Sequence, residues 1–140
     1  MKKLILAISV FILFGSSLAN AEQVYYCMDE LATGFKKINS SVWKSGAFKE
    51  QRHTVKFNDD HTKLIGLSGK LAWDCKTPWI GLSKHSTERV CYPPSHNGEL
   101  FQFNFKTLRF LYVNTPITGY VHNYGNSDSN AIEVGTCQKF

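Results

Sequence analysis

The four cysteines constrain the fold of this chain more than any other feature, because one lies early in the chain and another lies close to its C-terminal residue. Cys27 comes early, Cys137 lies three residues before the C-terminal Phe140, and Cys75 and Cys91 lie between them. An even number of cysteines in a small exported domain predicts disulfides. Metal binding is the competing interpretation, but no C-x-x-C pair or close Cys–His spacing supports it.

Four cysteines allow three disulfide pairings, and the sequence leaves all three open. We favour the nested arrangement, in which Cys27 pairs with Cys137 and Cys75 pairs with Cys91. The inner bridge would close a loop rich in turn formers, and the outer bridge would tie the last strand beside the first. By the chain-entropy model, an outer bridge across nearly the whole chain would stabilise the fold by about 4–5 kcal/mol.

Residues 1–21 have the pattern of a secretory signal peptide. Two lysines follow the first methionine, an apolar run extends from Leu4 to about Leu13, and Ala19-Asn20-Ala21 provides an A-x-A cleavage site. The apolar run is shorter than the roughly 20 residues that a membrane-spanning helix needs. The pattern therefore predicts cleavage near Ala21 and a single exported β-domain over residues 22–140, periplasmic or secreted and not membrane-spanning.

The charge of the predicted domain is modest. Residues 1–21 contain two lysines and no acidic residue, so the remaining 119 residues carry 14 Lys and Arg against 11 Asp and Glu, a net charge of +3. Such a charge gives a mild preference for anionic partners. Because the basic residues are scattered, with Lys36-Lys37 the one adjacent pair after residue 21, nucleic-acid binding is disfavoured.

Composition favours strands over helices. After residue 21 the chain contains eight Phe, six Tyr and three Trp, interrupted by Gly, Asn, Asp and Pro. About eight short strands with frequent turns predict an all-β fold, a small disulfide-stabilised antiparallel barrel or sandwich. Pairing of the first and last strands would close a barrel and remove its exposed edges.

Strand-like segments recur along the whole domain. The clearest is Phe101–Phe105, in which three phenylalanines alternate with polar residues and share one face. In Lys70–Cys75 the same alternation predicts that Leu71, Trp73 and Cys75 point inward. The other expected strands are Gln23–Met28, Gly34–Ile38, Arg52–Phe57, Lys63–Leu67, Glu88–Tyr92, Leu108–Asn114, Thr118–Tyr124 and Ala131–Cys137.

One segment also fits a helix. Trp43, Ala47 and Phe48 fall at positions i, i+4 and i+5, which is consistent with a short helix beginning after Ser40 or Ser41. A glycine inside this segment weakens the prediction. The expected fold therefore has room for one short helix.

The histidines do not form a recognisable active site. His53 alternates with Val55 and Phe57, which predicts a partly buried structural histidine, and His61 lies in the Asp-rich turn "NDDHT". His85 and His96 lie in loop-like segments. The sequence contains neither H-E-x-x-H nor G-x-S-x-G, so we predict no catalytic residue, no metal site and no cofactor.

Aromatic residues are the candidates for ligand binding. If Thr118–Tyr124 is a strand, Tyr120, His122 and Tyr124 line one face and can stack on a ring or donate hydrogen bonds. Trp79, which follows a proline, is a candidate loop anchor for a partner. The alternative for Tyr120, His122 and Tyr124 is cross-strand packing within the sheet. The alternative for Trp79 is packing in the core.

Three functions remain open at this point. We favour a noncatalytic binding module that holds a small ligand or an envelope protein. The first alternative is a small secreted hydrolase that uses His122 or His61 as a base, and the second is a passive envelope assembly protein. The sequence does not specify the ligand, the partner or the oligomeric state.

Overall fold

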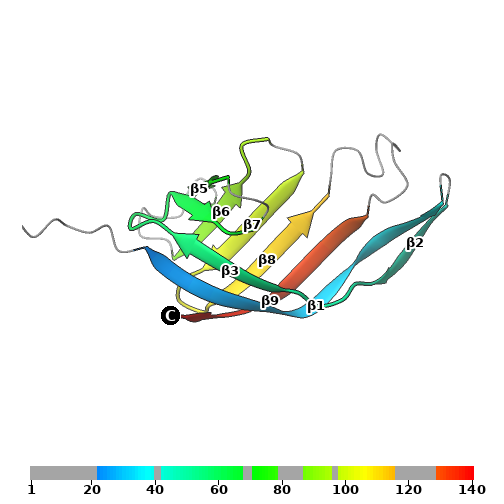
Figure 1. The fold of residues 1–140 in the computed structure, drawn as a ribbon, viewed down its shortest axis with the longest axis horizontal. Coiled ribbons are helices and arrows are strands. Elements are labelled where there is room, and N and C mark those ends of the chain that lie inside the picture. Colours follow the sequence, from blue (N-terminus) through cyan, green and yellow to red (C-terminus); the bar gives the residue numbers. More distant parts are fainter. Residues whose placement is uncertain (1–21, 40–41, 68–70, 79–86, 96–97, 116–128) are drawn as a thin grey trace, which may run out of the picture.

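Alternating buried and exposed side chains build the protein from β-strands alone. The computed structural model describes residues 22–39, 42–67, 71–78, 87–95, 98–115 and 129–140, and within these ranges it contains nine strands and no helix (Figure 1). The predicted signal segment and the predicted strand Thr118–Tyr124 lie outside the described residues. The strands are β1 Gln23–Asn39, β2 Val42–Ala47, β3 Arg52–Phe57, β4 Lys63–Ile65, β5 Trp73–Lys76, β6 Glu88–Tyr92, β7 Glu99–Asn104, β8 Arg109–Asn114 and β9 Asn130–Lys139.

The sheet closes on itself through its first and last strands. Strands β3 to β9 pair in chain order, β1 pairs with both β3 and β9, and every pairing is antiparallel. Eight strands therefore form a closed barrel, and β2 is an additional strand on β1 (Figure 1). The prediction of an all-β antiparallel fold is confirmed, and the barrel is the correct choice between barrel and sandwich.

β1 is longer than predicted and serves two parts of the molecule. The sequence suggested separate strands at Gln23–Met28 and Gly34–Ile38, but one strand of 17 residues covers both. Its first half pairs with β3 and its second half pairs with β2, while β9 lies on its other side. A register shift between Asp29 and Leu31 marks a β-bulge opposite β9, and such a bulge lets a strand bend without ending.

The short helix considered for the segment after Ser41 does not form. Val42–Ala47 is strand β2, which pairs antiparallel with β1 so that Ala47 lies opposite Thr33. Beyond β2, the Phe48 amide donates to the Ala32 carbonyl at 2.9 Å. The helical spacing was misleading because pairing with the long strand β1 supplies these backbone groups with partners that a short helix would leave unsatisfied at its ends.

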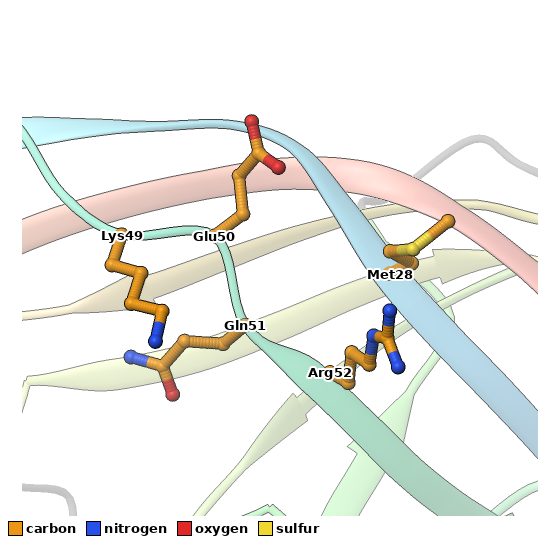
Figure 2. Close-up of a pocket in the computed structure, with 5 residues that line it drawn as sticks. All are labelled: Met28, Lys49, Glu50, Gln51 and Arg52. Carbon is orange, nitrogen blue, oxygen red and sulfur yellow. The ribbon is translucent and has the colours of Figure 1, made fainter.

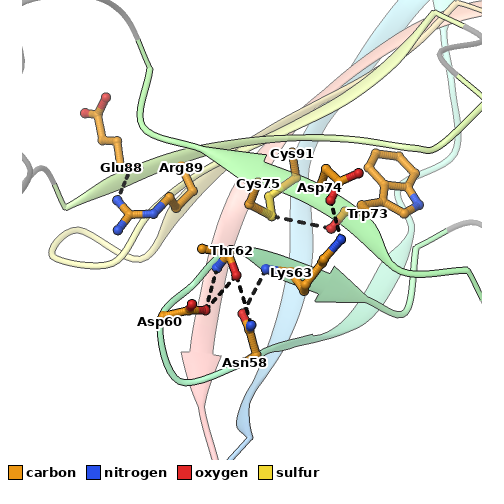
Figure 3. Close-up of a disulfide and its surroundings, with 10 residues drawn as sticks. All are labelled: Asn58, Asp60, Thr62, Lys63, Trp73, Asp74, Cys75, Glu88, Arg89 and Cys91. Atoms are coloured by element: carbon orange, nitrogen blue, oxygen red, sulfur yellow. Dashed lines mark hydrogen bonds and ion pairs between the residues drawn. A yellow bond between two sulfur atoms is a disulfide. The ribbon is translucent and has the colours of Figure 1, made fainter.

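Both disulfides join residues that face each other across adjacent strands. Cys27 and Cys137 are register partners on β1 and β9, and Cys75 and Cys91 are partners on β5 and β6. The nested pairing is therefore confirmed. Figure 3 shows the inner bridge beside the turn from β3 to β4, where the Cys75 amide donates to the Thr62 carbonyl at 2.8 Å.

Aromatic side chains fill the barrel. Trp73, Phe57, Phe101 and Phe103 are fully buried, and Phe57 and Phe103 stack with ring centroids 5.5 Å apart. The alternation predicted for Phe101–Phe105 is confirmed, with the third phenylalanine partly buried against the core. The inward orientation predicted for Leu71 is wrong: β5 begins only at Trp73, and Leu71 precedes it with its side chain 63% exposed.

Candidate functional site

The predicted ligand-binding residues cannot be placed. Trp79, Tyr120, His122 and Tyr124 lie outside the described residues, as do His85 and His96. Their proposed roles stay predictions. The described residues instead present two other features, a polar cluster inside the barrel and an apolar band on its outer face.

The polar cluster consists of Asp29 on β1, His53 on β3 and Glu133 on β9. The Nε2 atom of His53 lies 3.1 Å from Oε2 of Glu133 and 3.5 Å from Oδ1 of Asp29. The side chains of Asp29, Glu133 and His53 are 0%, 5% and 10% exposed. Two carboxylates and one imidazole thus converge in a nearly dry environment at the barrel wall.

Strand register brings these residues together. His53 is the register partner of Cys27, two residues before Asp29, and Asp29 is the partner of Gly135, two residues after Glu133. Because alternate residues of a strand share a face, all three side chains point into the barrel. The cluster therefore lies within two residues of the outer disulfide on β1, where the backbone is firmly cross-linked.

Backbone contacts hold Asp29 in place. The amide of Gln51 donates to Oδ2 of Asp29 at 2.7 Å, and the amide of Asp29 donates to the Gln51 carbonyl at 3.1 Å. The other carboxylate oxygen, Oδ1, is buried and has no hydrogen-bond partner. Oδ2 is therefore fixed by a hydrogen bond, whereas Oδ1 faces His53 and accepts no hydrogen bond.

Burial and charge shift the protonation equilibria of the cluster. The hydrogen bond to Glu133 raises the pKa of His53 above its ordinary value, in opposition to burial, and the two negative charges add to this effect. Burial raises the pKa of Asp29, and the charge of Glu133 acts in the same direction. The carboxylates thus favour the protonated form of His53, whereas burial, and next to it the charge of Glu133, disfavours the ionised form of Asp29.

Aromatic rings border the cluster. The His53 ring lies edge-on to Phe110 and Tyr112, with centroids 6.1 and 5.7 Å away. The Tyr112 hydroxyl donates to Oε1 of Glu99 at 2.9 Å, and burial, with this hydrogen bond, raises the pKa of the Tyr112 phenol. The rings exclude water from one side of His53 and so strengthen its interaction with the carboxylates.

The outer face of the barrel carries apolar side chains in adjacent rows. Leu31, Val134 and Leu111 are successive register partners across β1, β9 and β8, and Ile132 faces Val113 in the neighbouring row. Leu31 and Phe35 are each 56% exposed, and Ile132 is 46% exposed. We call this surface the outer apolar band: it comprises Leu31, Phe35, Leu111, Val113, Ile132 and Val134.

Hollows adjoin the band at both ends. One of about 430 Å³ is lined by Phe35, Trp43, Ser45 and Asn130, where β2 joins β1. A larger hollow of about 670 Å³ is lined by Met28, Arg52 and the link from β2 to β3. Figure 2 shows that Lys49 and Gln51 extend to one side of this link while Glu50 points to the other.

His61 has a structural environment. It lies in the turn after β3 with a φ of 56°, and its ring stacks on Phe105 with centroids 3.9 Å apart. Its Nε2 atom is buried without a hydrogen-bond partner, and burial lowers the pKa of the imidazole. The turn predicted for this segment is confirmed.

Comparisons with protein-family models, with curated proteins and with solved structures give no match. The described residues contain no helix that is long and apolar enough to span a membrane. The fold and its cross-links define the class of protein: a small disulfide-bonded β-barrel with a buried aromatic cluster and no recognised catalytic family. Two disulfides are typical of an oxidising, extracytosolic compartment.

Sequence reasoning placed His53 correctly on an inward face but missed its partners. Asp29 belongs to a segment that showed no clear alternation, and Glu133 lies 80 residues further along the chain than His53. One signal was present. In "AIEVGTC" the residues Ala131, Glu133, Gly135 and Cys137 share a face, so an inward-pointing cysteine places the glutamate inside.

Proposed function

We propose that this protein is a noncatalytic, exported binding module that holds a protein partner on the outer face of its barrel. The observation that carries the proposal is the outer apolar band, because contiguous apolar surface on a barrel exterior is typical of interaction sites. The barrel interior is filled by aromatic side chains. This favours a partner bound outside over a small ligand enclosed within.

The hollow beside Phe35 and Trp43 would hold an anchoring side chain of the partner. Its volume of about 430 Å³ exceeds the space that one large side chain needs, and its walls include two aromatic rings. Interfaces commonly depend on one or two such anchors, surrounded by contacts that exclude water. Leu31, Ile132 and Val134 would supply the surrounding contacts.

Charge favours an acidic partner over a second copy of this chain. Arg109, Thr136, Met28 and Arg52 form one row of register partners beside the band, with an arginine at each end. The predicted domain over residues 22–140 carries a net charge of +3. Two copies would therefore repel each other, whereas a partner with acidic residues around an apolar patch would be attracted.

Export supports a partner in the bacterial envelope or the surrounding medium. The segment before residue 22 has the charge, length and cleavage pattern of a signal peptide. Disulfides persist where thiol-reducing systems are absent. The partner is thus expected in the same compartment as the mature domain.

Site-specific photo-crosslinking in cells tests the proposal. A crosslinking residue at position 132, inside the band, should trap one dominant acidic protein, and the same residue at position 71 should not. The trapped protein is then purified, and its affinity is measured by calorimetry for the wild type and for Ile132→Asp and Leu71→Asp. Both positions are exposed, so both variants should fold.

We expect Ile132→Asp to weaken binding by about tenfold or more, as for a residue near the centre of an interface. Leu71→Asp should leave the affinity within about twofold, because a side chain outside the interface contributes little. Equal crosslinking from both positions, or equal affinities of the two variants, would contradict the proposal. Self-association of the purified chain through position 132 would also contradict it.

A further inference from the structure

Three potential metal ligands converge inside the barrel. Oδ1 of Asp29, Nε2 of His53 and Oε2 of Glu133 all lie within 4.8 Å of one another. They come from three different strands of a closed and cross-linked sheet, so their positions are set by the fold rather than by flexible loops. Imidazole nitrogen and carboxylate oxygen are among the donor types that bind zinc in catalytic sites.

A single proton on His53 Nε2 cannot provide hydrogen bonds to both carboxylates. Nε2 of His53 carries at most one hydrogen, which is directed to Glu133 at 3.1 Å. Oδ1 of Asp29 then lies 3.5 Å away, is fully buried and has no hydrogen-bond partner. An unsatisfied buried oxygen is costly and calls for an explanation such as an ion.

The separations of the His53 nitrogen from the two carboxylate oxygens fit a tetrahedral ion. With metal–ligand distances of about 2.0–2.1 Å, two ligands of a tetrahedral zinc lie about 3.3 Å apart. The His53–Glu133 and His53–Asp29 separations of 3.1 and 3.5 Å bracket this value. We propose that Asp29, His53 and Glu133 bind a divalent transition-metal ion, and that Zn²⁺ matches the donor set best.

Charge balance supports the same assignment. A protonated His53 between two ionised carboxylates leaves a net charge of −1 in a nearly dry site. A divalent ion held by two carboxylates and a neutral imidazole gives a net charge of zero. Binding the ion would therefore offset the like-charge repulsion between the buried carboxylates of Asp29 and Glu133.

The donor set also discriminates between ions. Calcium needs six to eight oxygen ligands and magnesium keeps an octahedral shell, whereas this cluster offers one nitrogen and two carboxylate oxygens. Three protein ligands leave a fourth position for water or for a group from a partner. The His53 side chain is 10% exposed, so solvent can reach the cluster.

Sequence spacing could not reveal this site. Its ligands lie 24 and 80 residues apart, whereas the zinc patterns that are recognisable from sequence have ligands a few residues apart. The expectation that the chain has no metal site followed from the absence of such patterns. The barrel supplies by strand register the proximity that the linear sequence lacks.

Metal binding to the full oxidised chain tests the proposal. Protein stripped with a chelator is titrated with Zn²⁺ by calorimetry, and with Co²⁺ to record the visible absorption of a four-coordinate ion. The variants are Glu133→Gln and Asp29→Asn, which keep the side-chain shape and remove one charged ligand. His61→Asn is the matched control, since it removes a histidine outside the cluster and asparagine tolerates the positive φ at this position.

We expect one equivalent of Zn²⁺ to bind the wild type and the His61→Asn control with the same affinity. Glu133→Gln and Asp29→Asn should each weaken binding by at least about tenfold and abolish the four-coordinate Co²⁺ absorption. Added Zn²⁺ should also raise the melting temperature of the wild type, but not that of Glu133→Gln.

Two results would overturn the proposal. One is a wild-type chain whose melting temperature and Co²⁺ absorption do not respond to metal. The other is binding that persists unchanged in both cluster variants, which would assign the ion to histidines elsewhere in the chain. Folding of each variant is verified by its circular dichroism spectrum, so loss of metal is distinguished from loss of structure.

Discussion

Cys27 and Cys137 are register partners on the first and last strands of the barrel, and a disulfide joins them at the seam where the sheet closes. They are 110 residues apart in the chain. β1 and β9 are the paired strands that lie farthest apart in the sequence. Bringing such distant segments together has the largest entropic cost of loop closure. The bridge thus stabilises the part of the fold that would otherwise be the most costly to form.

Removing the outer disulfide should destabilise the protein more than removing the inner one. By the chain-entropy model, a loop of 110 residues is worth about 4.8 kcal/mol and a loop of 16 residues about 3 kcal/mol. The double variants C27S/C137S and C75S/C91S isolate the two bridges. Urea unfolding of each variant measures the difference in the free energy of unfolding.

The comparison has a built-in control, because each variant exchanges the same two atoms in a buried cross-strand pair. Equal losses of stability for the two variants would show that burial and local packing outweigh loop length. A larger loss for C75S/C91S would refute the assignment of the outer bridge as the principal cross-link.

Substitution of Gly135 by alanine should destabilise the barrel beside the polar cluster. A Cβ atom at this position would lie 2.1 Å from the Met28 carbonyl oxygen and 2.8 Å from the Phe110 ring. β1 and β9 would have to separate at the bulge, at a cost of about 1–3 kcal/mol. Thermal and urea unfolding of Gly135→Ala measure this cost.

Gly46→Ala is the matched control in strand β2. Its Cβ atom would meet nothing closer than the Lys36 side chain at 3.9 Å, and its backbone angles suit any residue. This variant should be as stable as the wild type or more stable by about 0.5–1 kcal/mol, because alanine loses less backbone entropy on folding. A Gly135→Ala protein as stable as Gly46→Ala would contradict the close approach of β1 and β9.

Truncation of Phe103 should lower the free energy of unfolding substantially, because its ring packs in the centre of the aromatic core. Its ring contacts Tyr25, Phe57 and Phe105 with centroids 4.8–5.5 Å away, and it is fully buried. Phe103→Ala should cost about 3–5 kcal/mol in the free energy of unfolding. Leu71→Ala, at an exposed position, should change it by less than about 0.5 kcal/mol; similar losses in the two variants would show that the barrel is loosely packed.

The sequence predicted an all-β antiparallel fold, with a closed barrel as one of two alternatives, because the alternation that defines its strands is local. Alternation at Phe101–Phe105 and Arg52–Phe57 requires half-buried strands, and cysteines near both ends favour joining the first strand to the last. The unity of β1 was missed, since its bulge and polar second half have no clear period. The helical spacing around Trp43 misled for a related reason: β2 is specified by its partner β1 and not by its own pattern.

The polar cluster could be predicted only in part. Period two places His53 inside, and the inward cysteine at 137 places Glu133 inside, but nothing local shows that the two meet. Their contact depends on the relative register of three strands, two of which pair across the barrel seam. Register across long sequence separations is set by the whole fold, so a single sequence does not reveal it.

His61 should make the protein less stable as the pH falls below about 6.5. Burial lowers the pKa of its imidazole in the folded state, and Arg89 and Lys139 add repulsion, so the folded protein resists a proton that the unfolded chain accepts near pH 6.5. The unfolded state therefore binds more protons in this range, and the free energy of unfolding decreases on acidification. This loss continues until the pH reaches the lowered pKa of the folded state.

The measurement is urea unfolding of the wild type and of His61→Asn between about pH 7.5 and pH 5.5, on either side of the ordinary histidine pKa. Every other titrating group is common to both proteins, so its contribution cancels in the difference. The wild type should lose stability relative to the variant as the pH decreases. Only the wild type has a buried imidazole, stacked on Phe105, whose protonation is disfavoured in the folded state. A difference that stays constant with pH would show that His61 titrates alike in both states, and a difference of opposite sign would place its ring in contact with an unseen anion.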